Sequence, residues 1–324
     1  MTRSGNSSAT SFHDICPAIT STTYRLRSFL LNRPLRWRNQ AALMERTAGR
    51  AEVIVGLIDG SVAAAHADLA TENIRVLSQR SNRAPEHASG TALTHGTFVA
   101  GILAARRGTA APAICPGCTL MVRPIFLQPP VAGSDTPSAS PQDLADAVVD
   151  CVEAGARILN LSLALATPSP NSEPKLAQAF DHAAGHGTLV VAAAGNQGTV
   201  GSSAITRHPW VIPVVACNLA GRPLAISNLG NSIARRGVMA PGDAVTSLGT
   251  KGELFTAGGT SVATPFVTGT LALLLSIFPE ADAAQAKLAT TRAHVRRATI
   301  VPPMLDAWAA YQALLKQQRS WSHA

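Results

Sequence analysis

Residues 140–163 read SPQDLADAVVDCVEAGARILNLSL and contain a helix start, a helix stop and a strand in one run. Ser140 is a favoured residue before a helix, a proline follows it in the first turn, and Asp143 stands at the third helical position. Gly155 ends the helical pattern, and the apolar run at 157–163 comes directly after it. We therefore predict a helix followed at once by a buried strand.

The same alternation of helix and strand extends over most of the chain. An apolar helix is expected to open at Thr264-Pro265 and to end before Pro279, and another helix is expected at 174–185. Such alternation predicts an α/β fold with a mostly parallel twisted sheet and helices on both faces. Besides 157–163, the short apolar runs that we expect to form its strands are 53–58, 119–126, 188–194 and 211–217.

The composition indicates a packed globular protein, since 46% of the 324 residues are hydrophobic and 14% are charged. The net charge of +8 comes from 27 Lys and Arg against 19 Asp and Glu. No basic stripe interleaved with aromatic residues appears in the sequence, so nucleic acid is not an expected partner. We divide the chain into a basic extension at 1–50, a main domain at 51–315 and a tail at 316–324.

The five cysteines argue against a disulfide framework, because they are odd in number and widely spread. Cys115 and Cys118 have the CxxC spacing, but no second pair of Cys or His accompanies them to complete a zinc site. They also enter a predicted strand, whereas redox chemistry favours a helix start. We expect a reducing compartment, no metal and no cofactor.

The first residues lack the uninterrupted apolar segment and the small-residue cleavage site of a secretory signal. We therefore expect a cytoplasmic protein, with non-classical export as the alternative. The most apolar stretch, 261–278, is about as long as a membrane span, but it includes Pro265 and several Thr and Ser residues. A buried core helix explains this stretch better, and stable membrane insertion is not expected.

Three residues stand where an α/β fold places its chemistry. Asp59 ends a buried apolar run, at the edge where parallel sheets carry their active sites. His95 follows Thr94, a potential cap, at a helix start, and Ser261 stands where a glycine-rich turn meets an apolar helix. Taken singly, each also fits a plain structural role as a turn aspartate, a surface histidine or a helix-capping serine.

Four motifs, in this order, resemble those of the subtilase family of serine proteases. They are LIDG around Asp59, HGTFVAG around His95, VVAAAGNQG around Asn196 and GTSVATPFVTG around Ser261. The resemblance spans about residues 53–311 and implies a single three-layer subtilisin-like domain that hydrolyses peptide bonds. It implies that Ser261 attacks the scissile carbonyl, His95 takes its proton, Asp59 fixes the His95 tautomer, and Asn196 binds the oxyanion with the Ser261 N–H.

The resemblance further implies a peptide or protein substrate, held in a groove. The groove would be formed by Ser162, Leu163, Ala164, Leu165, Ala194 and Gly195. No carboxylate occurs in these segments, and Gln197 follows the oxyanion asparagine, so basic side chains should bind poorly and small or medium apolar ones well. The sequence carries no signature of an oligomeric state.

The chain departs from the family pattern at four places, one of which is Phe98, where the family motif commonly has a second histidine. Asp59 is followed by Gly60 where the family usually has Ser or Thr, and Ala164-Leu165 replaces a pair of glycines in the groove. The segment after the histidine helix, where many relatives bind calcium, contains Arg106 and Arg107 but no side-chain carboxylate or amide. We therefore expect no high-affinity calcium site there.

Within the family, the chain resembles the cyanobactin maturation proteases, which cut leader or follower segments from ribosomally made peptides. The features shared with them are LIDG, PGC before 119–126, and DLADAVVDCVEAGARILNLS. Two alternatives remain open: a catalytically weak subtilase-like module that binds extended peptides by strand addition, and a transpeptidase or macrocyclase. The four retained catalytic residue types argue against the first, and the sequence shows no inserted segment large enough for the solvent-excluding lid that the second requires.

Overall fold

The computed structural model describes residues 35–77, 90–126, 139–164, 173–291 and 299–321. Seven strands form one sheet in the order β2-β3-β1-β4-β5-β6-β7, and all neighbouring strands in it are parallel. The predicted parallel sheet is thereby confirmed. Its strands are β1 (Ile54–Asp59), β2 (Ile74–Val76), β3 (Thr119–Pro124), β4 (Ile158–Leu161), β5 (Leu189–Ala193), β6 (Val211–Cys217) and β7 (Val238–Pro241). A separate antiparallel hairpin is formed by β8 (Val245–Leu248) and β9 (Leu254–Ala257).

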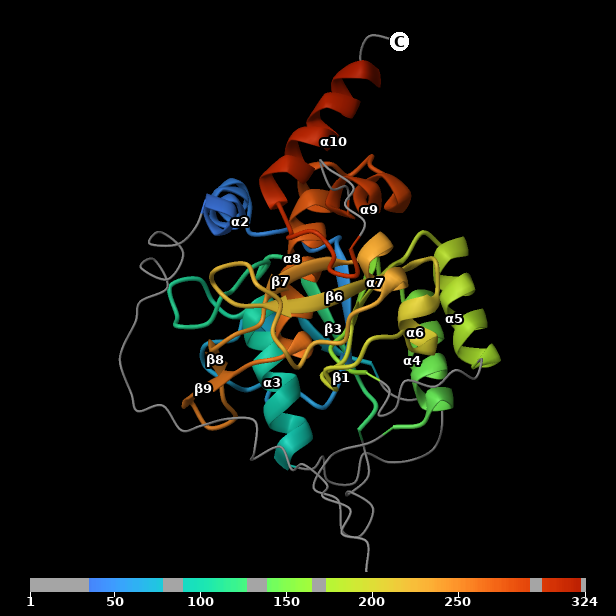
Figure 1. Cartoon of the computed structure of the whole chain (residues 1–324). Coiled ribbons are helices and arrows are strands. Elements are labelled where there is room, and N and C mark those ends of the chain that lie inside the picture. Colours follow the sequence, from blue (N-terminus) through green and yellow to red (C-terminus); the bar gives the residue numbers. More distant parts are fainter. Residues whose placement is uncertain (1–34, 78–89, 127–138, 165–172, 292–298, 322–324) are drawn as a thin grey trace, which may run out of the picture.

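Helices cover both faces of the sheet, which makes three layers (Figure 1). Successive residues of a strand point to opposite faces, and β5 shows the result. Leu189 and Val191 belong to the core cluster that includes α3 (Gly90–Ala104) and α8 (Thr260–Ile277). Val190 and Ala192 belong to a second cluster on the opposite face. Most helical residues of that second cluster come from α4 (Pro141–Glu153) and α5 (Pro174–Gly185), which pack against each other.

The first and last described helices pack together beside α8. α10 (Ala307–Trp321), at the top of Figure 1, contacts both α9 (Ala283–Thr291) and α2 (Leu35–Arg46). Leu43 of α2 and Leu314 of α10 are buried in the main core. The division at residues 50 and 315 stays a prediction, and residues 1–34 lie outside the described part. The remaining short helices are α6 (Ala204–Arg207), α7 (Asn231–Arg236) and the 3-10 helix η2 (Thr71–Asn73).

The capping signals that define the fold at the sequence level are confirmed. The Ser140 hydroxyl accepts a hydrogen bond from the Asp143 N–H, and the Asp143 carboxylate accepts one from the Ser140 N–H, so both orphan donors are satisfied. Gly155 has φ +86° just after the helix, a conformation that L side chains rarely adopt. α5 also begins at the predicted proline.

Two predicted helix starts are wrong. α8 begins at Thr260, so Pro265 lies inside the helix rather than in its first turn. α3 begins at Gly90, and Thr94 donates its hydroxyl back to the Gly90 carbonyl instead of capping a later start. Inside a helix, a threonine can donate its hydroxyl to the carbonyl four residues back, as Thr94 does, whereas Pro265 leaves one carbonyl of α8 without its helical N–H.

α8 is the one helix of the described residues that is long and apolar enough to cross a membrane. In the folded chain, 89% of its apolar window is buried, between the sheet and the surrounding helices. This burial agrees with the core helix that the sequence predicts.

Candidate active site

The sheet order brings three predicted site segments to one edge. β1, β4 and β5 are neighbours in the parallel sheet, and the polar residues that follow them lie at their carboxyl ends. Asp59 is the last residue of β1, Ser162 follows β4, and Asn196 follows β5. α3 and α8, which pack against each other, supply His95 and Ser261.

Asp59 and His95 form a direct pair. The distance from His95 Nδ1 to Asp59 Oδ1 is 2.7 Å, with the carboxylate fully buried and the imidazole 22% exposed. Since a carboxylate can only accept, Nδ1 carries the hydrogen and the neutral ring presents Nε2 as an acceptor. Burial lowers the pKa of His95, but the Asp59 charge and hydrogen bond outweigh it, so that the pKa is raised overall.

Gly60 explains the departure from the usual motif. Its N–H donates to Asp59 Oδ1 at 2.6 Å, so the backbone still supports the carboxylate. A side chain at this position would place its Cβ 2.0 Å from the Ala92 carbonyl oxygen of α3. Glycine therefore allows α3, and His95 with it, to approach the end of β1. Asp59 Oδ2 is buried and has no partner among the described residues.

Ser261 is the second residue of α8, as expected for a serine at a helix N-terminus. Gly259, the residue before the helix, has φ +126°, and a Cβ there would lie 2.9 Å from the Asn196 amide nitrogen. Glycine is thus required both by the backbone conformation and by the approach of Asn196. The helix dipole adds positive potential where an oxyanion would form.

Thr260 fixes the orientation of the Asn196 amide. Asn196 Oδ1 accepts from the Thr260 N–H and from the Thr260 hydroxyl, each at 2.9 Å. Because a backbone N–H can only donate, the oxygen of the amide must face Thr260. The amide NH₂ is then left as a donor beside Gly259 and Ser261, which is the geometry an oxyanion donor needs.

Of the six predicted groove residues, the structure describes five. Leu163 and Ala164 follow Ser162 after β4, Ala194 and Gly195 follow β5, and Leu165 lies outside the described residues. The Ser162 side chain is turned inward, is buried, and donates to the Ser261 carbonyl oxygen at 2.8 Å. Any contact of Ser162 with a bound peptide would therefore use its backbone.

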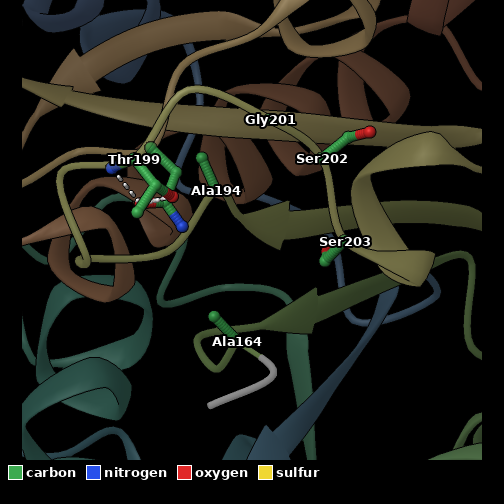
Figure 2. Close-up of a pocket in the computed structure, with 7 residues that line it drawn as sticks. Ala164, Ala194, Thr199, Gly201, Ser202 and Ser203 are labelled. Atoms are coloured by element: carbon green, nitrogen blue, oxygen red, sulfur yellow. Dashed lines mark hydrogen bonds between the residues drawn. The ribbon is translucent and has the colours of Figure 1, made fainter. Parts of the chain in front are cut away.

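A pocket opens between Ala164 and Ala194, and Ser203 lies to the right of both in Figure 2. None of its lining residues carries a charge. Five of them were not among the predicted groove residues, because they come from the loop after Asn196 and from a segment some thirty residues further along the chain. The complete lining is Ala164, Ala194, Thr199, Gly201, Ser202, Ser203 and Asn228.

Asn228 holds the chain segment that follows Asn196. Its Oδ1 accepts from the N–H groups of Gln197 and Thr199, and its NH₂ donates to Gln197 Oε1 at 2.6 Å. These bonds fix the Gln197 side chain against Asn228 beside the pocket. The side chain of Gln197, which follows the predicted oxyanion donor, is therefore hydrogen-bonded to another residue of the protein.

The loop after α3 contains a positively charged side chain, that of Arg107, which is hydrogen-bonded within the protein. The Arg107 guanidinium donates to four backbone carbonyls, two in the loop, one in the last turn of α2 and one just after α2. The carbonyls belong to Ala113, Ile114, Met44 and Thr47. Within the described residues, no group of three or more His, Cys, Asp or Glu side chains could hold a metal ion.

Comparisons with known proteins show the family of the chain. The chain matches the Subtilase family over residues 50–316. It is 33% identical to Subtilisin DY from Bacillus licheniformis over 242 residues, 73% of this chain and 81% of that protein. Other curated subtilisins match over a stretch that makes up 58% of their own length.

Two solved structures share most of the fold. The prenylagaramide maturation protease PagA superposes with a TM-score of 0.74 at 25% identity, over 85% of this chain and 98% of that one. The self-cleaved protease domain of PatA superposes with a TM-score of 0.71 at 29% identity, over 83% and 98%. The predicted three-layer subtilisin-like domain is therefore confirmed.

The fold and the family match together define the class of the molecule, a serine-type endopeptidase. Within that class, the chain belongs to the Subtilase family.

Proposed function

We propose that this chain cleaves peptide bonds through an acyl-enzyme formed on Ser261. His95 Nε2 takes the Ser261 proton during attack and returns it to the leaving amine, while Asp59 holds the imidazole in the required tautomer. The Asn196 NH₂ and the Ser261 N–H bind the oxyanion. The observation that carries the proposal is the 2.7 Å contact between Asp59 and His95 at the same sheet edge as an amide oriented toward α8.

A fluorophosphonate probe tests this proposal directly, because it reacts only with an activated serine. We expect stoichiometric labelling of the wild-type protein, with the modified peptide mapping to Ser261. Ser261→Ala should fold normally, resist labelling and lose hydrolysis of a peptide substrate. Labelling at another serine, or full peptidase activity in Ser261→Ala, would rule the mechanism out.

We further propose that the substrate is a peptide precursor, a proposal supported by the likeness to PagA and PatA, which are described as maturation proteases of prenylagaramide and patellamide. The uncharged pocket supports a preference for small or medium apolar residues before the cleaved bond. A Lys or Arg side chain would lose its hydration there without a compensating carboxylate, at a cost of several kcal/mol.

A positional-scanning library of linear peptides, analysed by mass spectrometry, measures this preference. We expect cleavage after Ala, Val or Leu to exceed cleavage after Lys or Arg by about tenfold or more, since about 1.4 kcal/mol corresponds to tenfold. Ala164→Asp would place a carboxylate in the pocket and should shift the preference toward basic residues. Dominant cleavage after Arg or Lys by the wild type would contradict the pocket assignment.

A further inference from the structure

The Ser261 carbonyl lacks its regular partner in α8. In an α-helix the carbonyl of one residue accepts from the N–H four positions later, and for Ser261 that position is Pro265, which has no N–H. The Ser162 hydroxyl donates to this carbonyl at 2.8 Å. A side chain at the end of β4 thus takes the place of the missing helical hydrogen bond.

Ser162 is the last member of a chain of three buried side chains. Its oxygen accepts from Asn160 Nδ2 at 2.8 Å, and Asn160 Oδ1 accepts from the Thr268 hydroxyl at 2.8 Å. All three residues are at most 3% exposed. We call the three together, Thr268, Asn160 and Ser162, the hydroxyl relay.

The donor and acceptor roles in the hydroxyl relay are set by the Ser261 carbonyl at its end. The Ser261 carbonyl can only accept, so Ser162 must donate to it and must accept from the Asn160 NH₂. Asn160 then presents its oxygen to Thr268, whose hydroxyl must donate. Thr268 follows Ser261 by seven residues, about two helical turns, so both stand on the face of α8 toward β4.

We propose that the hydroxyl relay positions the nucleophile, which makes Ser162, Asn160 and Thr268 positioning residues for the reaction. The inference rests on the proposed function of Ser261. The Ser261 backbone carries both the attacking hydroxyl and one oxyanion N–H, so a rotation of this one peptide unit displaces both groups. Misplacing a reacting group by about 1 Å costs about 10²-fold in rate.

This role differs from that of a substrate contact in its kinetic effect. A side chain that binds the peptide equally in the ground state and the transition state changes KM, whereas one that aligns the nucleophile changes kcat. The inward orientation of the Ser162 side chain favours the second effect.

The experiment compares Ser162→Ala, Thr268→Val and the double variant with the matched control Thr270→Val. Thr270 is also buried in α8, and its hydroxyl also donates at 2.8 Å to a buried amide oxygen, that of Gln40. Among the described residues its hydroxyl bonds to Gln40 and to the Phe266 carbonyl and not to the relay, so the control loses the same kind of hydrogen bond from the same helix. For each folded variant, kcat, KM and the rate of fluorophosphonate labelling are measured.

We expect Ser162→Ala to lower kcat and the labelling rate by about tenfold, with KM within about twofold. Thr268→Val should lower kcat by about threefold, and the double variant should equal Ser162→Ala, because the relay is already interrupted there. Thr270→Val should keep the wild-type kcat. If Ser162→Ala does not fold, Thr268→Val against Thr270→Val tests the relay from its far end.

The inference would be overturned by a change in KM alone, by additive losses in the double variant, or by an equal loss in Thr270→Val. If these variants label as fast as the wild type, the positioning role fails while the proposed function stands. Failure of the wild type itself to react at Ser261 overturns both.

Discussion

His95 is subject to two opposing influences on its pKa. Burial of the ring disfavours the charged imidazolium, whereas the charge of Asp59 and the hydrogen bond to it favour the imidazolium. The pair with Asp59 prevails, and the pKa lies above the ordinary value of 6.5. Only the neutral ring can accept the proton of Ser261, so the raised pKa of His95 sets the pH at which we expect activity to appear.

We predict that kcat/KM rises with pH through a midpoint above pH 6.5, the value at which an ordinary histidine titrates. The contribution of this pair to stability runs the other way: it is complete below 6.5 and is lost as pH rises through the raised pKa. In Asp59→Asn the effect of burial remains alone, so NMR should find the His95 pKa below 6.5. An unchanged His95 pKa in Asp59→Asn would contradict this explanation.

At the residue scale, motifs in the sequence predicted which residue types meet, but not how they are held. Asn196 was identified from its motif, whereas its orientation depends on Thr260, 64 residues away. The inward turn of Ser162 depends on Ser261, 99 residues away. Contacts of this kind arise from tertiary packing and leave no local pattern.

The loop after α3 is held by an arginine at the place where many subtilases bind calcium. Arg107 gives hydrogen bonds to carbonyls from two segments, and it thereby joins this loop to the end of α2. A guanidinium has five N–H donors in a planar arrangement, which suits several carbonyl oxygens at once.

We predict that Arg107→Ala lowers the melting temperature by at least about 5 °C, because hydrogen bonds to a charged group contribute about 1.5–3 kcal/mol each. Addition of EDTA to the wild type should leave the melting temperature unchanged. Differential scanning calorimetry measures both. A fall of several degrees with EDTA, reversed by calcium, would show that a metal rather than Arg107 stabilises this region.

At the element scale, the buried strands β1, β3, β4, β5 and β6 were predicted from their apolar runs, and the others were not. β6 has the predicted bounds, and it is buried at every position. β2 has three residues that are partly or fully exposed, so no apolar run marks it. The starts of α3 and α8 were misplaced because Thr and Pro occur both at helix starts and, as here, inside helices.

At the scale of the whole molecule, a buried ion pair joins the sheet to the helical layer that contains α4. Arg123 of β3 donates through Nε at 3.0 Å and through Nη2 at 2.8 Å to Asp150 of α4. The side chains are 5% and 8% exposed, so neither charge can regain its hydration if the other is removed.

We predict that Asp150→Ala lowers the free energy of unfolding by about 3–5 kcal/mol, because it leaves the Arg123 guanidinium buried without its partner. Glu52→Ala serves as the control, since its pair with Arg50 is exposed and should contribute little. Urea denaturation followed by tryptophan fluorescence compares the two. Equal, small effects of both variants would show that Arg123 finds other solvation.

α8 carries the proposed nucleophile and also belongs to the part of the core that we expect to unfold last. Its amide hydrogens lie in the most buried helix of the described residues, so they should exchange with solvent only when the entire domain opens. Ser261 lies in the first turn of that helix, and local fraying of surface loops would leave the proposed nucleophile in place. The active and inactive forms would then be separated by a single global transition, and the half-life of activity would equal the half-life of the native state.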